Sequence, residues 1–394
     1  MNKYTSITII SPCFGDIERL MQSIKAQYIT KDESIEVILI DDNCNNKDNY
    51  SKYTHDFMPD NIVVKLIVNK EHKYQGKGRQ IGFETATNKF CLTMDCDDMY
   101  SPYCVCSLLD TLNQWYNDEQ NKELASISFD FMGFDRNCNW QHIGVPNQSI
   151  WVQSRLWNKE FVLEHKLNEL YDTSNVSSKM GEDYPWVNLF DYYVNHESDK
   201  YESITLSETN PPMAFWFPNV NSLSRQDKFY SEHLAGWTAW SSISIVEKEM
   251  EYNAKHNIDK NEDENLKQDI LNKCIYTWYN YWNFIATLCG TEYKPVVEDW
   301  NAIVTATNKI KELLLPYYDE IQYQDIYDQL YLVKHNSDCH CINAMESFFD
   351  FMKNDFHQMS YDELMEFKKN NYFDGINFQT SNQTIAFKKR HEIM

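Results

Sequence analysis

The chain has 394 residues, more than one compact core normally holds, so we expect two domains or one domain with an extension. Its 59 acidic and 36 basic residues give a net charge of −23, and so acidic a surface repels nucleic-acid backbones and anionic membranes. No stretch reaches the ~20 apolar residues of a membrane helix, and the start lacks a signal-peptide pattern. We expect a cytoplasmic protein with no integral membrane segment, eleven reduced cysteines and, outside the basic segment 70–79, no contact with nucleic acid.

Strands alternate with helices through the first hundred-odd residues. β-rich runs cover 6–10, 35–40, 62–68 and 90–94, and helical spacing follows over about 16–28, 80–86 and 101–115. The alternation predicts an α/β domain with a parallel sheet. Ligands of such sheets bind at the carboxyl ends of the strands. This sequence places polar residues at such ends, in 14–16, 41–42 and 95–98.

The second half of the chain is less regular. We expect strands over 124–131 and 213–217 and a helix over 156–165. From about 242 onwards glycine and proline become rare and long helical patterns dominate. We therefore predict one domain over 1–230 and a mostly α-helical C-terminal region over 231–394, which covers a substrate, forms an oligomer or docks to a partner.

The run Asp95-Cys96-Asp97-Asp98 follows the fourth predicted strand directly. In an extended segment, residues two apart point to the same side, so Asp95 and Asp97 can present two carboxylates to one ligand. Hard divalent cations prefer such oxygen ligands and keep positions open for phosphate. Taken alone, the run is more often a solvated acidic turn, in which Asp98 caps the next helix. Its place after an apolar strand favours the metal site.

Two further features, an acidic pair and an arginine, place charged side chains at positions suited to catalysis or ligand binding. Glu182 and Asp183 stand at the start of a predicted helix, where the helix dipole favours anions. Asp183 can serve as a base that deprotonates a hydroxyl, although an ordinary helix cap is the commoner role of such a residue. Arg79 follows a glycine-containing loop and can fork onto phosphate or stack on a base; a solvated charge is equally consistent with the sequence.

An ordered set of segments resembles the inverting, GT-A-fold enzymes called glycosyltransferase family 2. Individually the segments are weak signals, but together, over about Ile7 to Arg225, they are specific. The sequence departs from the family's pattern at Phe14-Gly15, Asn43-Cys44 and Gln80. Because these positions would contact the base and the ribose, the identity of the nucleotide base is left undetermined. The segments that carry the resemblance are Ile7–Glu18 (strand, Pro-Thr-Tyr-Asn, Glu), Ile38–Cys44 (Val-Asp-Asp-Gly-Ser), Asn69 with Gly78–Gly82 (Ala-Arg-Asn-x-Gly), Asp95–Asp98 (Asp-Ala-Asp-Asp), Ser154–Phe161 (Gly-Lys-Leu-Tyr-Arg-Arg-x-Phe), Gly181–Asp183 (Glu-Asp) and Asn219–Ser224 (Asn-Ser-Leu-Ser).

The resemblance implies a GT-A-type, Rossmann-like mixed sheet flanked by helices. It also implies metal-dependent transfer of a sugar from a nucleotide-sugar, with a UDP-sugar favoured, to a carbohydrate or other hydroxyl acceptor in one inverting displacement. Asp183, beside Glu182, would be the general base, and Asp97 with Asp95 would hold Mn2+ or Mg2+. Nucleotide-sugar contacts are implied for Pro12, Phe14, Glu18, Asp41, Asp42, Arg79, Asp95, Cys96, Asp97, Ser222, Ser224 and Arg225.

Weaker candidates lie outside this set. A late histidine, His335 or His340, could complete the metal site, although most histidines are ordinary surface or core residues. Trp140 and Trp151 could line the acceptor site. Two other functions stay open: a nucleotidyltransferase that makes sugar nucleotides, which the absence of a basic residue in 12–16 argues against, and a non-catalytic nucleotide-sugar-binding scaffold of the same fold. The sequence does not indicate an oligomeric state.

Overall fold

The structure, a computed structural model, describes residues 4–43, 50–54, 57–118, 121–134, 140–144, 152–170, 183–206, 213–217, 244–258, 360 and 362–363. The chain divides into two compact units. The first comprises Met1–Ser174 and Gly181–Ser222, and the second Asn175–Met180 and Leu223–Met394. The division expected between 230 and 231 falls outside the described residues and stays a prediction.

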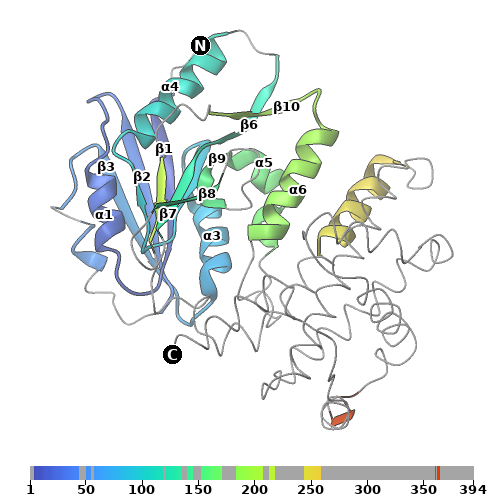
Figure 1. Ribbon diagram of the computed structural model, residues 1–394, viewed down its shortest axis with the longest axis horizontal. Coiled ribbons are helices and arrows are strands. Elements are labelled where there is room, and N and C mark those ends of the chain that lie inside the picture. Colours follow the sequence, from blue (N-terminus) through green and yellow to red (C-terminus); the bar gives the residue numbers. More distant parts are fainter. Residues whose placement is uncertain are drawn as a thin grey trace, which may run out of the picture. The chain divides into compact units, whose positions relative to one another are not determined.

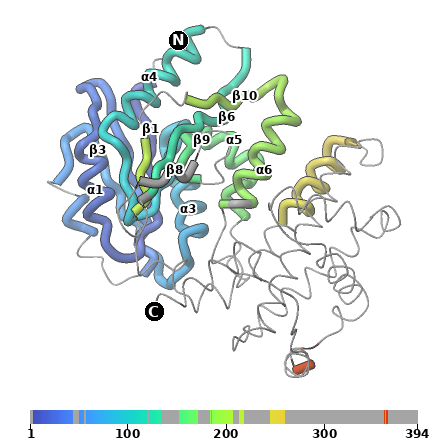
Figure 2. Tube along the Cα trace, viewed as in Figure 1, coloured from blue at the N-terminus to red at the C-terminus, as the bar shows by residue number. Residues whose placement is uncertain are grey.

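A seven-stranded sheet forms the centre of the first unit (Figure 1, Figure 2). Its strand order is β10-β6-β9-β4-β1-β2-β3. Every neighbouring pair is parallel except the two that involve β9, which runs antiparallel to β4 and β6. The predicted α/β class with a mixed sheet is confirmed. The strands are β1 (Ser6–Cys13), β2 (Ser34–Asp41), β3 (Ile62–Val68), β4 (Phe90–Thr93), β6 (Glu123–Ser128), β9 (Arg155–Asn158) and β10 (Tyr201–Thr205).

Helices cover both faces of this sheet, because alternate residues of the central strands are apolar on both sides. Ile7 and Ile9 of β1 belong to the main core cluster, together with residues of α1 (Glu18–Lys25) and α4 (Cys104–Asn117). The opposite face of β1, at Ile10 and Pro12, meets two glycines of α3 (Tyr74–Thr85).

Aromatic side chains join the helices on that second face. Phe83 of α3 packs on Trp186 of α6 (Asp183–His196), with ring centroids 5.2 Å apart. Phe190 of α6 contacts Phe161 of α5 (Lys159–Glu164) at 5.0 Å and Trp157 of β9 at 4.8 Å. This aromatic layer anchors α6, whose first residue is Asp183, to α3, α5 and β9.

A smaller four-stranded sheet, of order β5-β11-β7-β8, follows the acidic run. Its strands are β5 (Met99–Tyr100), β7 (Phe131–Phe134), β8 (Trp140–Gly144) and β11 (Ala214–Trp216). Two short 3-10 turns, η1 (Val152–Ser154) and η2 (Leu167–Glu169), complete the described elements of this unit.

Two element predictions are wrong in part. The segment expected as one helix over 156–165 begins as strand β9, and only Lys159–Glu164 is helical. Asn158 accepts hydrogen bonds from the amides of Glu160 and Phe161, which places the helix start there. The helix expected from 80 begins at Tyr74, so the glycine-containing segment is part of α3 and not a loop.

The second unit is described over one helix, at 244–256, whose Ile245 and Val246 are buried. The prediction of a mostly α-helical region otherwise concerns residues outside the described ranges. Within the part of the chain that the structure describes, no helix combines the length and the apolar character needed to cross a membrane.

Candidate active site

Three adjacent parallel strands, β4, β1 and β2, end at one edge of the main sheet. Cys13 at the end of β1 pairs with Asp41 at the end of β2, and the amide of Met94, just past β4, donates to the carbonyl of Ile10. The polar segments 14–18, 41–42 and 95–98 therefore leave the sheet next to one another, as expected for an α/β domain.

Arg79 is brought to this edge by the close approach of α3 to β1. Gly78 and Gly82 lie one helical turn apart and face the strand. A Cβ on Gly82 would meet Cγ2 of Ile10 at 2.1 Å, and one on Gly78 would meet Cβ of Pro12 at 2.8 Å. Only glycine permits this packing. Arg79, between the two glycines, is fully buried as a result.

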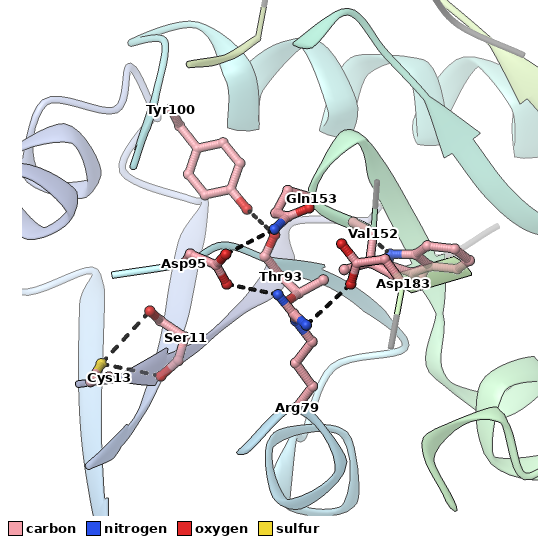
Figure 3. Close-up of polar contacts among 10 residues, drawn as sticks. Ser11, Cys13, Arg79, Thr93, Asp95, Tyr100, Val152, Gln153 and Asp183 are labelled. Carbon is pink, nitrogen blue, oxygen red and sulfur yellow. Dashed lines mark hydrogen bonds and ion pairs between the residues drawn. The ribbon is translucent and has the colours of Figure 1, made fainter. Parts of the chain in front are cut away.

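The Arg79 guanidinium joins two carboxylates that lie 88 positions apart in the chain (Figure 3). Nη2 donates to Oδ1 of Asp95 at 2.7 Å, and Nη1 donates to Oδ1 of Asp183 at 3.2 Å. Nε donates to the Thr93 hydroxyl at 3.2 Å. Because a buried cation is tolerated only when it is paired and hydrogen-bonded, this arrangement holds Asp95 and Asp183 in fixed positions around it.

Asp95 receives a second donor from a residue that the sequence did not indicate. The Gln153 side-chain amide donates to Oδ2 of Asp95 at 3.1 Å. The Asp95 side chain keeps 28% of its surface exposed, so it can still reach a ligand. Gln153 comes from the short turn η1 before β9, and nothing in its sequence neighbourhood signals a contact with a residue 58 positions earlier.

The acidic run is a turn and not the extended segment that we expected. The amide of Asp98 donates to the carbonyl of Asp95 at 3.2 Å, so alternation along a strand does not set the directions of the carboxylates. Arg19 of α1 holds the turn by donating to the backbone carbonyl of Asp97 at 2.7 Å, and its guanidinium lies over the Phe217 ring.

Asp98 has a structural role, but it does not cap a helix. Its Oδ1 accepts a hydrogen bond from the Phe217 amide at 2.9 Å, which ties the turn to the end of β11. Its Oδ2 is buried and has no hydrogen-bond partner among the described residues. Burial raises the pKa of Asp98 well above its usual range, and the neighbouring carboxylates Asp97 and Asp95 raise it further. No side chain caps the next helix, α4.

Asp42 organises the loop that leads from β3 to α3. Its carboxylate accepts hydrogen bonds from the amides of Lys73 (2.7 Å) and Tyr74 (2.6 Å) and from the Asn69 side chain (3.0 Å). It also lies 2.7 Å from Nδ1 of His72. These donors already engage both oxygens of Asp42. Asp41, at the last position of β2, is also buried.

An aromatic group stands beside this loop. The Phe14 ring, whose side chain is 60% exposed, lies 4.8 Å from the His72 ring, which lies 4.1 Å from the Tyr74 ring. Phe14 was a predicted site residue, whereas His72 was not. These rings are tilted against one another, by 39° and 52°, and the exposed Phe14 ring at the edge of the sheet offers a surface on which a planar base can stack.

Glu18, also a predicted site residue, stands at the first position of α1. Its carboxylate accepts hydrogen bonds from the Tyr53 hydroxyl, the Gln22 side chain (2.9 Å) and Lys52 (3.2 Å). The Tyr53 hydrogen bond, followed by those from Gln22 and Lys52, lowers the pKa of Glu18 to about 2. Cys96, in contrast, is buried, and its burial raises the pKa of its thiol. Cys96 thus packs into the core cluster.

The remaining predicted residues cannot be placed. Trp140 lies in β8, of which only the backbone is described. The others lie outside the described residues: Glu182, Trp151, Ser222, Ser224, Arg225, His335 and His340.

The donor chemistry of the acidic turn suits a hard cation. Asp95 and Asp97 supply only carboxylate oxygens, the ligands that Mg2+ and Mn2+ prefer. In the described parts of the chain, no group of three or more metal-ligating side chains occurs. The residue types of the turn thus fit a hard cation.

Residues 8–119, from β1 through the acidic turn to the end of α4, match the family model described as Glycosyl transferase family 2. No curated protein matches the sequence. The chain is similar to S. aureus TarS 1-349 in complex with UDP, at 14% identity and a TM-score of 0.41, over 81% of this chain and 93% of that one. It is also similar to S. aureus TarS 1-349 in complex with UDP-GlcNAc, at 13% identity and a TM-score of 0.43, over 70% of this chain and 81% of that one. A third similar structure is GalNAc-T7 with UDP, GalNAc and Mn2+, at 14% identity and a TM-score of 0.41, over 65% of this chain and 55% of that one. The matched residues, 8–119, include the strands, α3 and the turn that supply Arg79 and Asp95, whereas Gln153 and Asp183 lie outside them, so the likeness to glycosyl transferase family 2 is that of this part of the chain.

Proposed function

We propose that this glycosyltransferase moves a sugar from a nucleotide-sugar, with a UDP-sugar favoured, to an acceptor hydroxyl in a single inverting displacement. The observation that carries the proposal is the Arg79 cluster. One buried cation contacts Asp95, on the turn where a diphosphate would bind, and Asp183, at the start of α6. Donor-side and acceptor-side groups are thereby held by a single side chain.

The donor is expected to lie along the carboxyl edge of β1, β2 and β4. The base would stack near Phe14 and His72, and Asp41 or Asp42 would accept a hydrogen bond from it. Pro12, in contact with α3, would form the floor beneath the nucleotide. Arg79 would approach the diphosphate. Asp97, with Asp95, would hold Mn2+ or Mg2+, and such an ion supplies positive charge against the departing diphosphate.

Asp183 is the proposed general base. Its carboxylate stands in the first turn of α6, where the helix dipole favours the charged form, and it accepts a hydrogen bond from Arg79. In the displacement, the acceptor oxygen bonds to the anomeric carbon while the bond from that carbon to the diphosphate oxygen breaks. The electron pair leaves with the diphosphate, and the acceptor proton passes to Asp183. One displacement inverts the anomeric configuration.

The cysteines bear on where the enzyme works. The five that the structure describes, Cys13, Cys91, Cys96, Cys104 and Cys106, are all free thiols. Unbridged thiols suit a reducing compartment, and we propose that the enzyme works in the cytoplasm.

Two substitutions test the proposal. Asp183→Asn removes the base and Asp97→Ala removes a metal ligand, and each should lower UDP-sugar turnover by about 10²-fold or more. Asp110→Asn, at an exposed position on α4, is the matched control and should leave turnover unchanged. Turnover is measured as UDP release from a panel of UDP-sugars with Mn2+, and the product anomer by NMR.

The outcomes separate the proposal from its alternatives. Unchanged turnover in both variants would exclude the assigned roles, and a retained anomeric configuration would exclude the single displacement. Binding of UDP to the wild-type chain without turnover of any sugar nucleotide would indicate the non-catalytic scaffold. Formation of a sugar nucleotide from a sugar phosphate and UTP would indicate the nucleotidyltransferase.

A further inference from the structure

A cavity of about 380 Å³ lies between α6 and the strands β6 and β10, the last two at one end of the main sheet. No residue of the Arg79 cluster lines it. Its floor comes from the two strands, its wall from the C-terminal half of α6, and one end from Arg155 at the start of β9. Figure 1 shows α6 beside α5 on this side of the sheet.

The cavity exists because the strands beneath α6 carry small polar residues. In the pairing of β10, β6 and β9, Ser203 lies opposite Ser126 and Ser126 opposite Trp157. The next row joins Thr205, Ser128 and Arg155 in the same way. Paired residues point to the same face of a sheet. Trp157 fills its part of this face, whereas Ser128, Ser203 and Thr205 leave space and make the floor hydrophilic, and the buried Ser126 donates a hydrogen bond to the Ser203 hydroxyl at 3.1 Å.

Arg155 is built into this cavity with an unused donor. Only 5% of its side chain is exposed, and its two terminal nitrogens bind Asp191 of α6 at 2.6 and 3.3 Å. Its guanidinium lies over the Trp157 and Phe190 rings, which fix its orientation. Among the described residues, Nε has no hydrogen-bond partner. This unpaired donor is buried, so it adds to the polar character of the wall and does not itself mark a ligand contact.

The charges around the cavity balance. The lining residues include two cations, Arg155 and Lys122, and two anions, Asp191 and Glu202. Each cation is near an anion, with Lys122 and Glu202 3.8 Å apart. A phosphate would need excess positive charge, and an apolar ligand does not match a lining of charged and hydroxyl side chains. A neutral ligand whose hydroxyl groups both donate and accept hydrogen bonds suits this lining.

We infer that the cavity is a saccharide-binding subsite that holds a distal sugar unit of the acceptor, which rests on the proposed function. The helix that carries Asp183 at its first position also carries Asp191 eight residues later, about 12 Å along the axis. The floor reaches Ser128 and Thr205, at the carboxyl ends of β6 and β10, which is the same edge of the sheet at which β4 ends. An extended acceptor can thus span the two places.

The test closes the cavity from its exposed side. Asn195 lines the wall on α6, and Asn195→Trp should block the mouth without changing the core. His196→Trp, one position on, exposed and outside the lining, is the matched control. Ser203→Val removes a floor hydroxyl at an exposed strand position, where valine favours the strand. The binding assay uses an array of neutral and acidic oligosaccharides, to which the fluorescently labelled full chain is applied. The UDP affinity of each variant is measured separately and shows whether the variant is folded.

We expect neutral oligosaccharides on the array to bind the wild-type chain and the His196→Trp variant equally well. Binding should be at least 10-fold weaker for the Asn195→Trp and Ser203→Val variants, while the UDP affinity of both variants stays unchanged. An empty array for the wild-type chain, or equal binding by Asn195→Trp, overturns the subsite. If UDP-sugar turnover and its dependence on Asp183 persist in that case, the proposed function stands alone. If saccharide binding is lost in Asn195→Trp but turnover ignores Asp183→Asn, the subsite stands and the proposed mechanism fails.

Discussion

Arg79 shows why a guanidinium, and not an ammonium, suits the centre of this site. Its Nε and two terminal nitrogens reach Thr93, Asp95 and Asp183 in three directions from one planar group. A lysine ammonium is a point charge on a flexible stem and cannot hold two carboxylates in a fixed relation. For Asp183 to take a proton from an acceptor, as proposed, its hydrogen bond with Arg79 must loosen, and a diphosphate bound at this edge would compete for the same guanidinium.

Glu18 allows a prediction about acid stability. Its pKa falls from 4.5 to about 2 in the folded chain, so the folded state binds this proton less readily than the unfolded state. The stabilising contribution is therefore complete above about pH 4.5 and is lost as the pH falls towards about 2. Glu18→Gln should lower Tm most near neutral pH, and its Tm should approach that of the wild-type chain in acid, as measured by differential scanning fluorimetry.

The matched control for this prediction is Glu71→Gln. Glu71 is exposed, and its described partner is Lys73 at 3.2 Å. Its substitution should change Tm little at any pH. A Tm difference for Glu18→Gln that is constant from neutral to acid pH would show that the hydrogen bonds from Tyr53, Gln22 and Lys52 do not depend on the charge of Glu18.

Residue types and their places at strand ends were predictable from the sequence, but side-chain partners were not. Arg79 was as consistent with a solvated charge as with a ligand contact, and its complete burial depends on glycines that meet β1. Gln153 and His72 gave no signal, because their contacts with Asp95 and Asp42 join segments far apart in the chain. Long-range contacts of this kind leave no spacing pattern in one sequence.

At the scale of elements, the close packing of α3 on β1 determines the position of Arg79. An alanine at Gly82 should improve the helix by about 0.5–1 kcal/mol. Its Cβ would nevertheless lie 2.1 Å from Ile10, and forcing a methyl group into a packed contact costs about 1–3 kcal/mol. Gly82→Ala should therefore lower the free energy of unfolding, measured in urea, and lower UDP affinity because α3 and Arg79 shift.

Two further variants make this prediction specific. Asp110→Ala, at an exposed position of α4, should leave both quantities almost unchanged. Ile10→Ala removes the atoms that clash, so in a double-mutant cycle it should reduce the cost of Gly82→Ala. If Gly82→Ala has the free energy of unfolding of the wild-type chain, or if the effects of the two substitutions on that free energy are additive, then the packing of α3 on β1 does not determine stability in this way.

The element predictions succeeded where the pattern was long and failed where it was short. The strands β1 to β4 are apolar runs with alternating helices, and the structure contains them as predicted. Leu156 and Trp157 directly precede a segment with helical spacing, so the sequence pattern assigns them to the same helix. They form part of a strand because β4 and β6 flank them on both sides, and pairing with two neighbours outweighs local spacing.

At the scale of the whole molecule, the net charge of −23 opposes the substrate that the site is proposed to bind. A nucleotide-sugar carries a negatively charged diphosphate, so the net charge repels it at a distance, while in the proposed mode Arg79 and a divalent cation would attract it only at short range. The approach of the donor should therefore be slow in low salt.

Raising the ionic strength from about 0.01 M to about 0.15 M shortens the Debye length from about 30 Å to about 8 Å. This screens the distant carboxylates but not the buried contacts of Arg79, so the association rate of UDP should rise over this range while its dissociation rate changes little. Stopped-flow fluorescence with a labelled UDP analogue and saturating Mn2+ measures both rates. An association rate that falls with salt would show that a local positive field, and not the net charge, governs how the donor reaches the site.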